Sequence, residues 1–455
     1  MISLYDTATR SVKPLKLKED GKISIYVCGP TVYDAPHIGH GRFVLVYDVF
    51  RRFLIWKGLE VNFVSNITDI DDKIIHRAEQ EGSDIFTIAK HWEEVWWETM
   101  DRLNIMRPDV TPHATEYVDQ MVKMIEELIV KESAYVTSDG VYLNVEGIET
   151  YGLLANQDLD DLLEGGGDRE VVGTEKKHPA DFALWKFSKE GEPSWPSPWG
   201  EGRPGWHTEC VVMSLDILGE GFDLHTGGLD LKFPHHENER AQALALGKEF
   251  ANHWMHNGFV ESGGQKMGKS LGNTKNLIEV CDSYDPRAYR LLILQTHYRS
   301  PIEVTDSTLE NSVTALDRID SLLRRSKDLD LDSCDTDEQI ISEFSKVLEN
   351  DFDTVTATDI LFSTVRDANS AIDAGHAETA ATLCKSLMIM CEVFGIKISL
   401  DEQIPEDIQE LSAQRQVARD SKDFELADQL RDQLTQLGWQ INDSDSGPSV
   451  WKQKF

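Results

Sequence analysis

Two histidines near the start of the chain stand between a segment typical of a β-strand and a segment typical of a helix. Ile23–Val27 has the composition of a strand, and Phe43–Phe50 is an apolar stretch that favours a helix. In such a strand–turn–helix unit, the backbone N–H groups and the imidazoles of His37 and His40 face the space beyond the strand end, where a phosphate chain can bind. The thiol of Cys28 stands at the mouth of the same site. Taken alone, the four residues His37-Ile-Gly-His40 are also typical of a turn with two surface histidines.

A second segment with catalytic chemistry lies far along the chain. Gly263–Gly272 carries Lys266 and Lys269 among four glycines. Glycines allow a loop to close over a ligand, and two ammonium groups can stabilise the charge that develops on a leaving pyrophosphate. The alternative is a solvated turn, which leaves the two glycine-framed lysines of a very acidic protein unexplained. Together the two segments favour a nucleotide-binding enzyme.

These segments resemble the HIGH and KMSKS signatures of class I aminoacyl-tRNA synthetases. They stand here as His37-Ile-Gly-His40 and Lys266-Met-Gly-Lys-Ser270, with Gly268 where the family pattern has serine. The resemblance implies that His37, His40, Lys266 and Lys269 are catalytic and that, with Gly39, they bind ATP, which brings Mg²⁺. Since both lysines remain, we expect activity to survive the change at Gly268.

Four further side chains have the donor chemistry of a metal site, although they are scattered along the sequence. His235 and Glu239 are four residues apart in a predicted helix, so they share one face. Cys28 and Cys210 add two thiols. This donor set suits zinc, but only the fold can bring it together. From spacing alone, two buried reduced cysteines and the start of an amphipathic helix are an open alternative.

The same four positions match the zinc ligands of cysteinyl-tRNA synthetases, which the chain resembles from about Tyr5 to Trp451. The similar segments are Tyr26–Asp34, Asn66–Ile74, Gly202–His207, Gly227–Leu231 and Thr296–Pro301. The resemblance implies one Zn²⁺ per subunit, held by Cys28, Cys210, His235 and Glu239. It also implies that Gly29, Thr31, Thr68 and Trp206 line the pocket for the amino acid, and that Gly227 and Asp230 bind the adenosine. For Trp206, a place in the hydrophobic core is the alternative.

Zinc suits a substrate that must be distinguished from serine. A plain pocket separates such near-isosteres by only ~10²-fold. Zinc binds a soft thiolate well and deprotonates a coordinated thiol, whereas a serine hydroxyl is much harder to deprotonate and is a poorer ligand. We therefore expect an open coordination position to select the cysteine thiolate and to make a separate editing domain unnecessary.

The order of predicted elements indicates an α/β protein with several parts. We predict a Rossmann-like, doubly wound parallel sheet with an insertion, followed by a helical bundle and a small mixed α/β C-terminal domain. The predicted parts are a first catalytic half (1–117), an insertion (118–203), a second catalytic half with zinc ligands (204–258), a lysine-loop and stem-contact region (259–305), a helical bundle (306–398) and an anticodon-binding domain (399–455). Within them we predict helices over Ile74–Met106, broken at Gly82, and over Val118–Lys131, a hairpin around Ser138–Gly140, and a helix capped by Asp285 with Pro286 in its first position.

The C-terminal part resembles the anticodon-binding domain of cysteinyl-tRNA synthetases. By that match Arg419, Phe424, Asp428 and Asp443 are candidate anticodon contacts, in which the ring stacks on a base and the polar groups read base edges. A solvated, charged helix face is the alternative for these residues.

The chain is very acidic for a protein that binds RNA. It has 455 residues with 45 Lys plus Arg against 80 Asp plus Glu, a formal charge of −35. RNA binding therefore requires local basic tracks, for which the candidates are Lys266, Lys269, Arg287, Arg290, Arg299 and Lys452–Lys454. High salt in the host would screen the excess charge. With no signal pattern, no apolar run of ~18 residues and no disulfide spacing of the cysteines, we expect a cytoplasmic protein without membrane contact, acting as a monomer.

The sequence therefore predicts the ATP-dependent ligation of L-cysteine to tRNA(Cys) through a cysteinyl-adenylate. Three alternatives stay open: a cysteine–glucosamine ligase of mycothiol biosynthesis, a zinc hydrolase built around His235–Glu239, and a silent RNA-binding paralogue. The segment from Arg415 to Trp451 favours the synthetase over the first, because a small sugar needs no anticodon domain.

Overall fold

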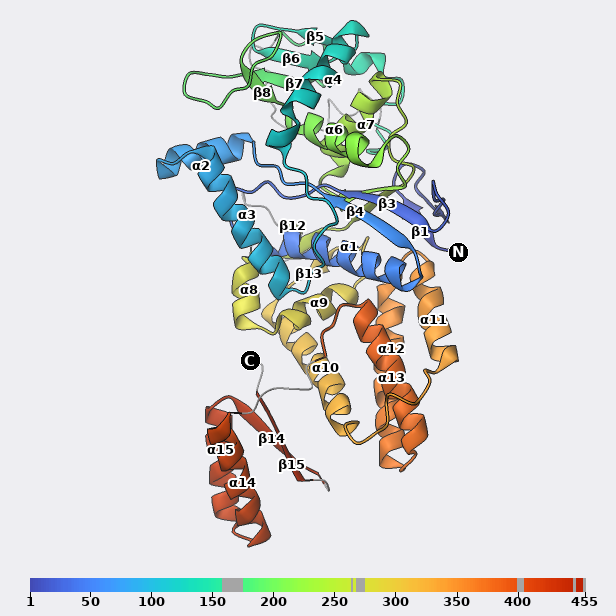
Figure 1. Cartoon of the computed structure of the whole chain (residues 1–455), viewed down its shortest axis with the longest axis vertical. Coiled ribbons are helices and arrows are strands. Elements are labelled where there is room, and N and C mark those ends of the chain that lie inside the picture. Colours follow the sequence, from blue (N-terminus) through green and yellow to red (C-terminus); the bar gives the residue numbers. More distant parts are fainter. Residues whose placement is uncertain (158–174, 263–264, 267–274, 399–404, 445–446, 453–455) are drawn as a thin grey trace.

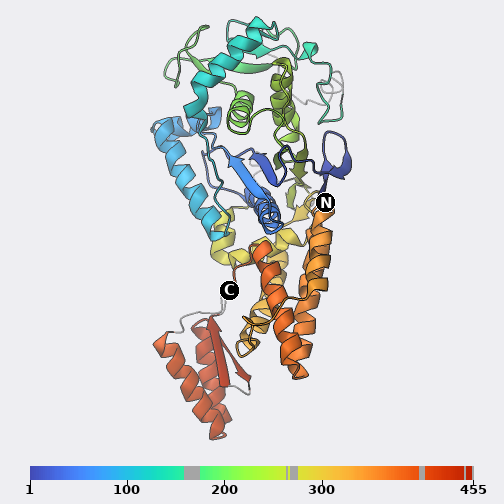
Figure 2. The ribbon, with the colours of Figure 1, turned by 45° about the vertical axis from the view of Figure 1, so that its right-hand side comes forward.

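The computed structural model describes residues 1–157, 175–262, 265–266, 275–398, 405–444 and 447–452. Figure 1 shows a parallel sheet with helices on both faces, an inserted subdomain at one end, a helical bundle at the other, and the C-terminal domain beyond the bundle. Figure 2, turned by 45°, shows the same order of parts. Among the helices of the described residues, none is both long and apolar enough to cross a lipid bilayer.

The central sheet has four parallel strands in the order β10-β9-β3-β4. Its strands are β3 (Lys22–Val27), β4 (Glu60–Ser65), β9 (Leu224–Gly228) and β10 (Trp254–Asn257). β3 and β9 are mostly buried, as expected for parallel strands covered on both faces. β3 has β4 on one side and the much later β9 on the other. The strand order reverses at this point, so the carboxyl ends of β3 and β9 are the expected ligand site.

Helices cover both faces of the sheet, as the prediction of a doubly wound fold requires. Figure 1 shows α1, α8 and α9 on one face and α6 and α7 on the other. These helices are α1 (Ile38–Trp56), α6 (Trp206–Leu218), α7 (Glu237–Ala245), α8 (Leu277–Ser283) and α9 (Pro286–Leu294). A short turn of helix over Lys232–His236 precedes α7. As predicted, Asp285 caps α9 through its side chain and Pro286 occupies the first helical position.

Two further helices and short strands complete this body. The predicted helix over Ile74–Met106 is present as α2 (Asp72–Glu81) and α3 (Ile85–Arg102), because Gly82 ends α2 in the left-handed region with φ 62°. The short strands are β1 (Ser3–Asp6), β2 (Ser11–Pro14), β11 (Val260–Ser262), β12 (Gln265–Lys266) and β13 (Ile302–Glu303).

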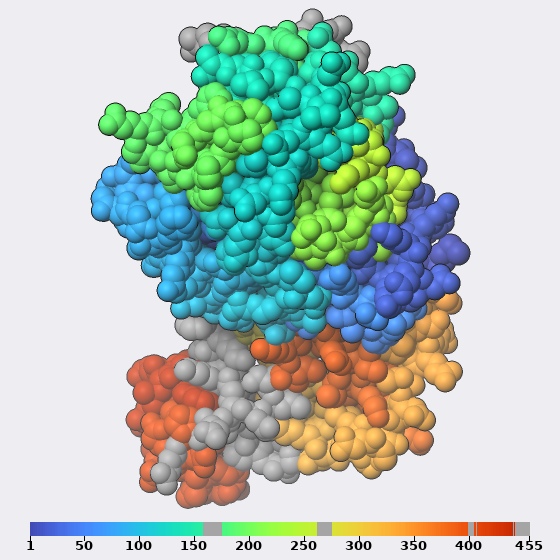
Figure 3. All heavy atoms as spheres, turned by 45° about the horizontal axis from the view of Figure 1, so that its top comes forward, coloured from blue at the N-terminus to red at the C-terminus, as the bar shows by residue number. Residues whose placement is uncertain are grey.

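The insertion forms an antiparallel sheet of its own, in the order β5-β6-β7-β8. It contains 3₁₀ turns at Ala114–Tyr117 and Val145–Gly147, α4 (Val118–Val130), β5 (Ala134–Val136), β6 (Gly140–Leu143), β7 (Phe182–Phe187) and β8 (Gly202–Pro204). The predicted helix and hairpin are both confirmed. The predicted boundary between 203 and 204 falls within β8, which pairs with β7. Figure 3 shows the insertion beside α2 on one face of the molecule, where Lys186 pairs with Asp72 at 2.7 Å.

Four helices form the bundle and pack on the catalytic body. They are α10 (Asp306–Arg325), α11 (Glu338–Glu349), α12 (Thr354–Asp373) and α13 (Ala377–Val393). One hydrophobic core runs from Ile23 and Ile25 of the sheet, through α1 and α9, to Leu387 and Met390 of α13. The bundle is therefore continuous with the face of the sheet that carries α1.

Three of the arginines predicted to form a basic track for RNA bind carboxylates of the protein instead. Arg290 is 1% exposed and its Nη1 lies 2.6 Å from Asp48. Arg287 pairs with Asp285 at 2.7 Å and with Asp320 at 2.8 Å, and Arg299 pairs with Asp351. The prediction is wrong for Arg290, which is buried, and the charges of Arg287 and Arg299 are neutralised in place. Of the other candidates, Lys269 and Lys454 lie outside the described residues.

The C-terminal domain is a pair of helices with a two-stranded hairpin. Its elements are α14 (Glu406–Asp420), α15 (Phe424–Gln436), β14 (Trp439–Ser444) and β15 (Gly447–Lys452). Ile408, Leu434 and Trp439 make its small core. This is the mixed α/β arrangement that the sequence predicts.

Candidate active site and metal cluster

The turn from β3 into α1 presents His37 and His40 as a stacked pair. Their ring centroids lie 3.7 Å apart with the planes at 13°. His37 is the N-cap of α1: its Nδ1 accepts from the backbone N–H of His40 at 3.3 Å, and the Nδ1 of His40 accepts from the N–H of His37 at 3.2 Å. The reciprocal cap fixes both rings at the positive end of the helix. An anion beyond β3 would meet these rings and the first turn of α1.

The loop with the lysines is attached to the same turn. Lys266 belongs to β12, which pairs with β11 so that Lys266 lies opposite Glu261. Lys269 lies outside the described residues. Where the chain is described again, the backbone N–H of Ile38 donates to the carbonyl of Lys275 at 3.1 Å, and His37 and Asn276 form an antiparallel bridge. The structure therefore places the return of the lysine loop directly on the histidine turn.

Cys28, Cys210, His235 and Glu239 come together as one fully buried cluster. Cys28 follows β3 and Cys210 lies on α6. His235 lies in the short helical turn that precedes α7, and Glu239 lies in α7 itself. The ligand atoms all lie within 4.8 Å of one another. Cys28 Sγ is 3.7 Å from Cys210 Sγ and 3.5 Å from Glu239 Oε1, and His235 Nε2 is 3.7 Å from Cys210 Sγ and 2.9 Å from Glu239 Oε1. The fold thus assembles what sequence spacing could not.

The cluster fits a tetrahedral zinc ion. Ligand atoms about 2.0–2.3 Å from such an ion lie roughly 3.3–3.8 Å from one another. The three separations that involve sulfur, 3.5–3.7 Å, fall in this range, whereas His235 and Glu239 are closer, at 2.9 Å. Two thiols are soft donors, and the carboxylate and imidazole complete a set of four.

The electrostatics of the cluster favour a charged, ligand-like state. The hydrogen bond from Cys28 lowers the pKa of Cys210 to about 6, whereas burial raises the pKa of Cys28 well above its usual value. Burial would lower the pKa of His235, but the Glu239 carboxylate and the Cys210 sulfur outweigh it and raise that pKa to about 10. A cation at this position would take over the role of the imidazolium proton and stabilise both sulfurs as thiolates.

Two histidines that the sequence analysis missed support the cluster from behind. His225 Nε2 lies 2.7 Å from the second carboxylate oxygen of Glu239, and His236 Nδ1 lies 2.8 Å from His256. With Cys28 and Glu239, His225 and His236 form an overlapping set of possible ligands. The set with Cys210 has two thiols and is the better zinc site. His225 then holds the Glu239 carboxylate, as outer partners of metal ligands commonly do. Only the tertiary fold brings His225, in β9, to α7, so no sequence signal could have found it, whereas His236 directly precedes α7 in the sequence.

Trp206 lies at the surface, above the cluster. Its indole stacks on His235 with centroids 4.1 Å apart at 20°, and it is 36% exposed. The alternative of a core aromatic is therefore excluded.

Thr68 and Gly29 form a polar wall beside Cys28. Thr68 Oγ1 donates to Glu209 at 3.0 Å and accepts from Asn66 at 3.2 Å, and Asn66 also accepts from the N–H of Gly29 at 2.9 Å. Thr31 pairs with Thr68 through a backbone bridge. A Cβ at Gly29 would overlap the carbonyl oxygen of Asn66, so only glycine fits there. Glu209, 1% exposed, is a third residue that the sequence analysis missed, since its neighbour Cys210 carried the only motif signal.

The residues predicted to bind the nucleotide line the carboxyl ends of β3 and β9. Gly39 is in the first turn of α1, where a Cβ would meet the ring of His37 at 2.9 Å. Gly227 lies in β9, where its carbonyl accepts from Tyr47 Oη at 2.8 Å. Asp230 is exposed two residues after β9. These three positions surround the reversal point of the strand order.

The four candidate anticodon residues lie together in one domain. Arg419 is exposed near the end of α14, and Phe424, 64% exposed, begins α15 with the exposed Asp428 one turn later. Asp443 lies in β14, and its side chain is outside the described part of the structure. An exposed aromatic ring one helical turn from a carboxylate can stack on one base and bind the edge of another.

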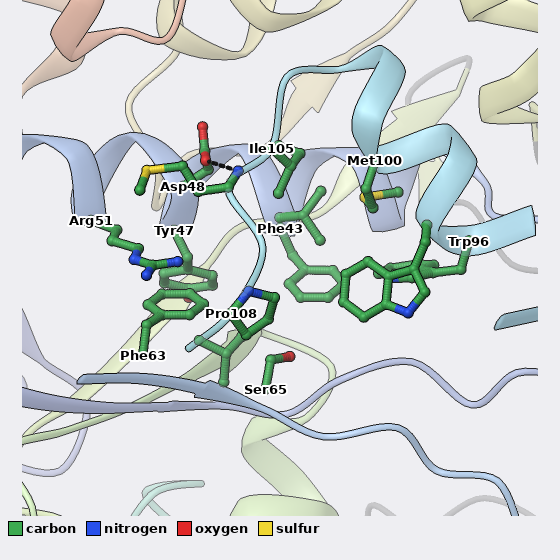
Figure 4. A pocket seen from close by; sticks show the side chains of 14 residues that line it. Phe43, Tyr47, Asp48, Arg51, Phe63, Ser65, Trp96, Met100, Ile105 and Pro108 are labelled. Carbon is green, nitrogen blue, oxygen red and sulfur yellow. Dashed lines mark hydrogen bonds between the residues drawn. The ribbon is translucent and has the colours of Figure 1, made fainter. Parts of the chain in front are cut away.

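A separate cavity of about 30 Å³ lies between α1, α3 and β4. Figure 4 shows Phe43, Trp96 and Met100 on one side of it and Arg51 stacked on Phe63 on the other. The guanidinium of Arg51 donates to the carbonyl of Arg107 and to Asp109, each at 2.6 Å. No ligand of the metal cluster lines this cavity.

Comparison with protein-family models finds two matches. Residues 14–314 match the model for the class I (C) tRNA synthetase catalytic domain, and residues 401–447 match the cysteinyl-tRNA ligase anticodon-binding domain. The first match begins at residue 14, inside the first predicted catalytic half, and runs through the insertion, the second half and the lysine-loop region to the start of the predicted bundle.

Curated relatives match the whole chain. The Cysteine--tRNA ligase of Coxiella burnetii is 42% identical over 464 residues, covering 100% of both chains. That of Caldicellulosiruptor saccharolyticus is 40% identical over 463 residues, covering 99% of each. Among solved structures, the methionyl-tRNA synthetase of Mycobacterium tuberculosis in complex with methionyl-adenylate has a TM-score of 0.61 at 16% identity, over 82% of this chain and 89% of that one. At such low identity the last comparison supports the fold alone.

Proposed function

Because the chain belongs to the cysteinyl-tRNA ligase family of class I aminoacyl-tRNA synthetases, we propose that it ligates L-cysteine to tRNA(Cys) with ATP and selects cysteine at the buried metal cluster. The observation that carries the proposal is the position of Cys28. This residue directly follows β3, so it joins the metal cluster while the chain after it leads into the His37–His40 turn. A thiol-reading site and a phosphate-binding site thus share one strand end.

Cys28, Cys210, His235 and Glu239 would hold one Zn²⁺. When bound, this ion supplies a soft Lewis acid that takes a thiolate in preference to a hydroxyl. The protein holds the four donor groups in fixed positions and excludes water from them. His225 holds the outer oxygen of Glu239, and the indole of Trp206 covers His235.

The walls of the pocket orient the amino acid. The hydroxyl of Thr68 donates to Glu209, so its remaining lone pair is available to the α-ammonium group of the substrate. Gly29 and Thr31 keep the backbone close to the substrate, since a side chain at Gly29 would collide with Asn66. Trp206 closes the side that faces solvent.

Adenylate formation would follow from positioning and charge stabilisation. The carboxylate of cysteine attacks the α-phosphate of ATP–Mg²⁺ in line, and pyrophosphate leaves. His37, His40, Lys266 and Lys269 stabilise the charge on the phosphates, with Gly39 allowing close approach at the start of α1. Gly227 and Asp230 hold the adenosine. A ribose hydroxyl at the end of the tRNA then takes the acyl group from the adenylate.

The C-terminal domain would bind the anticodon through Arg419, Phe424, Asp428 and Asp443. The match of residues 401–447 to an anticodon-binding domain favours a tRNA acceptor over an aminosugar. We infer further that the protein works as a monomer in the cytoplasm. All six cysteines are free, and a reducing compartment keeps thiolate ligands available.

ATP–pyrophosphate exchange tests the proposal directly. The purified protein should contain one zinc per chain, exchange pyrophosphate with cysteine but not with serine, and lose exchange after treatment with a chelator. It should charge tRNA(Cys) and leave glucosamine-inositol unmodified. Equal exchange with serine and cysteine would contradict the role of the metal cluster, and ligation to the aminosugar would contradict the acceptor.

A further inference from the structure

A buried arginine follows the histidine turn by two residues and has no role in the chemistry described above. Arg42 is 1% exposed, and its guanidinium donates to the carbonyl oxygens of Phe259 at 2.6 Å, Tyr298 at 3.2 Å and His297 at 3.4 Å, and also to that of Ser300. Within the described residues, no carboxylate forms an ion pair with it. A buried cation held only by carbonyl dipoles is unusual, because buried charges are normally paired.

The carbonyls that Arg42 binds belong to the base of the lysine hairpin. Phe259 immediately precedes β11, and β11 pairs with β12 so that Glu261 lies opposite Lys266. Ser300 leads into β13, which pairs with β11 in parallel through Val260 and Ile302. One guanidinium on α1 therefore holds the starts of β11 and β13, and β11 pairs with β12, the strand that carries Lys266.

The other end of the lysine loop returns to the same helix turn. The N–H of Ile38 donates to the carbonyl of Lys275, and the hydroxyl of Tyr289 on α9 donates to the carbonyl of Ile38 at 2.5 Å. Arg42 thus binds the segment that precedes the loop, and the backbone of Ile38 binds the residue that follows it. Both attachments lie within the first two turns of the helix that His37 caps.

The geometry requires arginine rather than any cation. The planar guanidinium presents donors in a fixed fork and reaches several acceptors at once, whereas a lysine ammonium is a point donor on a flexible stem. Burial lowers the pKa of Arg42 to about 10, which leaves it charged at neutral pH. Burying this charge costs desolvation free energy, so the arrangement stabilises the fold little. It does, however, define the position of four carbonyls relative to one helix turn.

We propose that Arg42 is a positioning residue for adenylate formation, which sets the strand of Lys266 in register with His37 and His40. The inference rests on the proposed function, since it concerns how the lysine loop meets the bound phosphates. It assigns no contact between Arg42 and substrate.

The first test compares Arg42→Lys with Arg51→Lys. Arg51 is equally buried on the same helix, but it binds Arg107 and Asp109 away from the loop. R42K should lower the kcat of cysteine-dependent ATP–pyrophosphate exchange by about 10–100-fold, the usual cost of a displaced catalytic group. Its KM for cysteine and its zinc content should match those of R51K. A wild-type kcat in R42K would overturn the inference, and so would a parallel loss in both variants.

A double-mutant cycle separates positioning from general damage. If Arg42 acts through the lysine strand, R42K should cost little more in a Lys266→Ala background than Lys266→Ala costs alone. A full additional loss in that background would mean that Arg42 acts elsewhere. If the wild type itself shows no cysteine-dependent exchange, the proposed function fails, and that result is distinct from a failure of this inference.

A second variant leaves Arg42 intact and moves its acceptors. A Cβ at Gly258 would lie 2.6 Å from the carbonyl oxygens of Arg299 and Ser300, so Gly258→Ala should push apart the segments that Arg42 joins. It should reproduce the selective loss in kcat with cysteine KM and zinc content unchanged. This variant decides the question if R42K fails to fold, and an unaffected kcat in Gly258→Ala would then contradict the inference.

Discussion

The indole of Trp206 lies flat on the imidazole of His235, with ring centroids 4.1 Å apart and an interplanar angle of 20°. The imidazole is 1% exposed, whereas the indole is 36% exposed. Trp206 is thus the layer between solvent and a buried histidine of the candidate metal cluster. A substrate that reaches the cluster must pass or displace this ring.

Replacement of Trp206 should weaken cysteine binding more than catalysis. Trp206→Ala removes the cover of His235, and we expect the KM for cysteine to rise by about tenfold, the scale of one lost aromatic contact. Trp206→Phe keeps a ring that can stack and should stay within about threefold. ATP–pyrophosphate exchange as a function of cysteine concentration measures both. An unchanged KM in Trp206→Ala would show that the indole does not contact substrate.

Loss of one thiol ligand should remove the metal and the activity together. Cys210→Ser leaves a poor zinc ligand in a buried site, so the protein should purify with far less than one zinc per chain and should not activate cysteine. Cys281→Ser is the matched control: Cys281 is also buried, but it lies on α8 outside the cluster. The zinc content and the cysteine-dependent ATP–pyrophosphate exchange of both variants test this prediction. Zinc retained in full by Cys210→Ser would remove Cys210 from the ligand set.

Much of the site could be predicted because its signals are local. The strand over Ile23–Val27, the turn with its two histidines and the helix start are contiguous, so residue composition alone identified the unit, whereas the capping by His37 was found only in the structure. Asp285 and Pro286 predicted the start of α9 for the same reason, since capping depends on neighbouring residues.

The rest depends on contacts between distant residues. The four candidate metal ligands were predicted from the resemblance, and their donor types alone left two buried thiols as an open alternative. Arg290 was misjudged because a sequence shows a charge but not its partner, which is Asp48 on another helix. Glu209, His225 and Arg42 were missed because each acts through groups that only the fold brings near.

Glu209 should matter for the substrate rather than for the metal. Glu209→Gln changes the acceptor that orients the Thr68 hydroxyl, 3.0 Å away, because the amide NH₂ can donate to that hydroxyl and turn it away from its present direction. We expect the cysteine KM to rise several-fold with zinc content unchanged. Glu237→Gln is the control, because Glu237 is as buried but binds Leu154 and Arg240 at the insertion. Equal changes of the cysteine KM in both variants would show that Glu209 has only a structural role.

The His113–Glu93 pair should make stability depend on pH. The hydrogen bond to Glu93, 3.0 Å away, raises the pKa of His113 above its unfolded value of about 6.5. His113 binds its proton more tightly when folded, so its contribution is complete below about pH 6.5 and is lost as the pH rises through the raised folded pKa. The same bond lowers the pKa of Glu93, which keeps its carboxylate charged at pH 6.

His113→Gln should therefore destabilise the protein more at pH 6 than at pH 9, as measured by urea unfolding. His76→Gln is the control, because the ring of His76 is 70% exposed and lies 3.9 Å from Glu79. The same loss of stability at both pH values for His113→Gln would show that the imidazolium charge does not contribute.

The buried Asp48–Arg290 pair joins α1 to α9 within the catalytic body and should contribute strongly to stability. Both side chains are 1% exposed, and Asp48 also accepts from Arg52 at 2.9 Å and from the N–H of Met106 at 2.7 Å. Arg290 in turn donates to the carbonyl of Phe394 at the end of α13. Asp48→Asn leaves two guanidinium groups without their carboxylate and should cost about 3–5 kcal/mol in the free energy of unfolding. Asp282→Asn breaks the exposed Arg102–Asp282 pair, 2.6 Å apart, and should cost at most about 1 kcal/mol. Denaturant unfolding of both variants measures the difference, and equal losses would mean that burial adds nothing to the Asp48 pair.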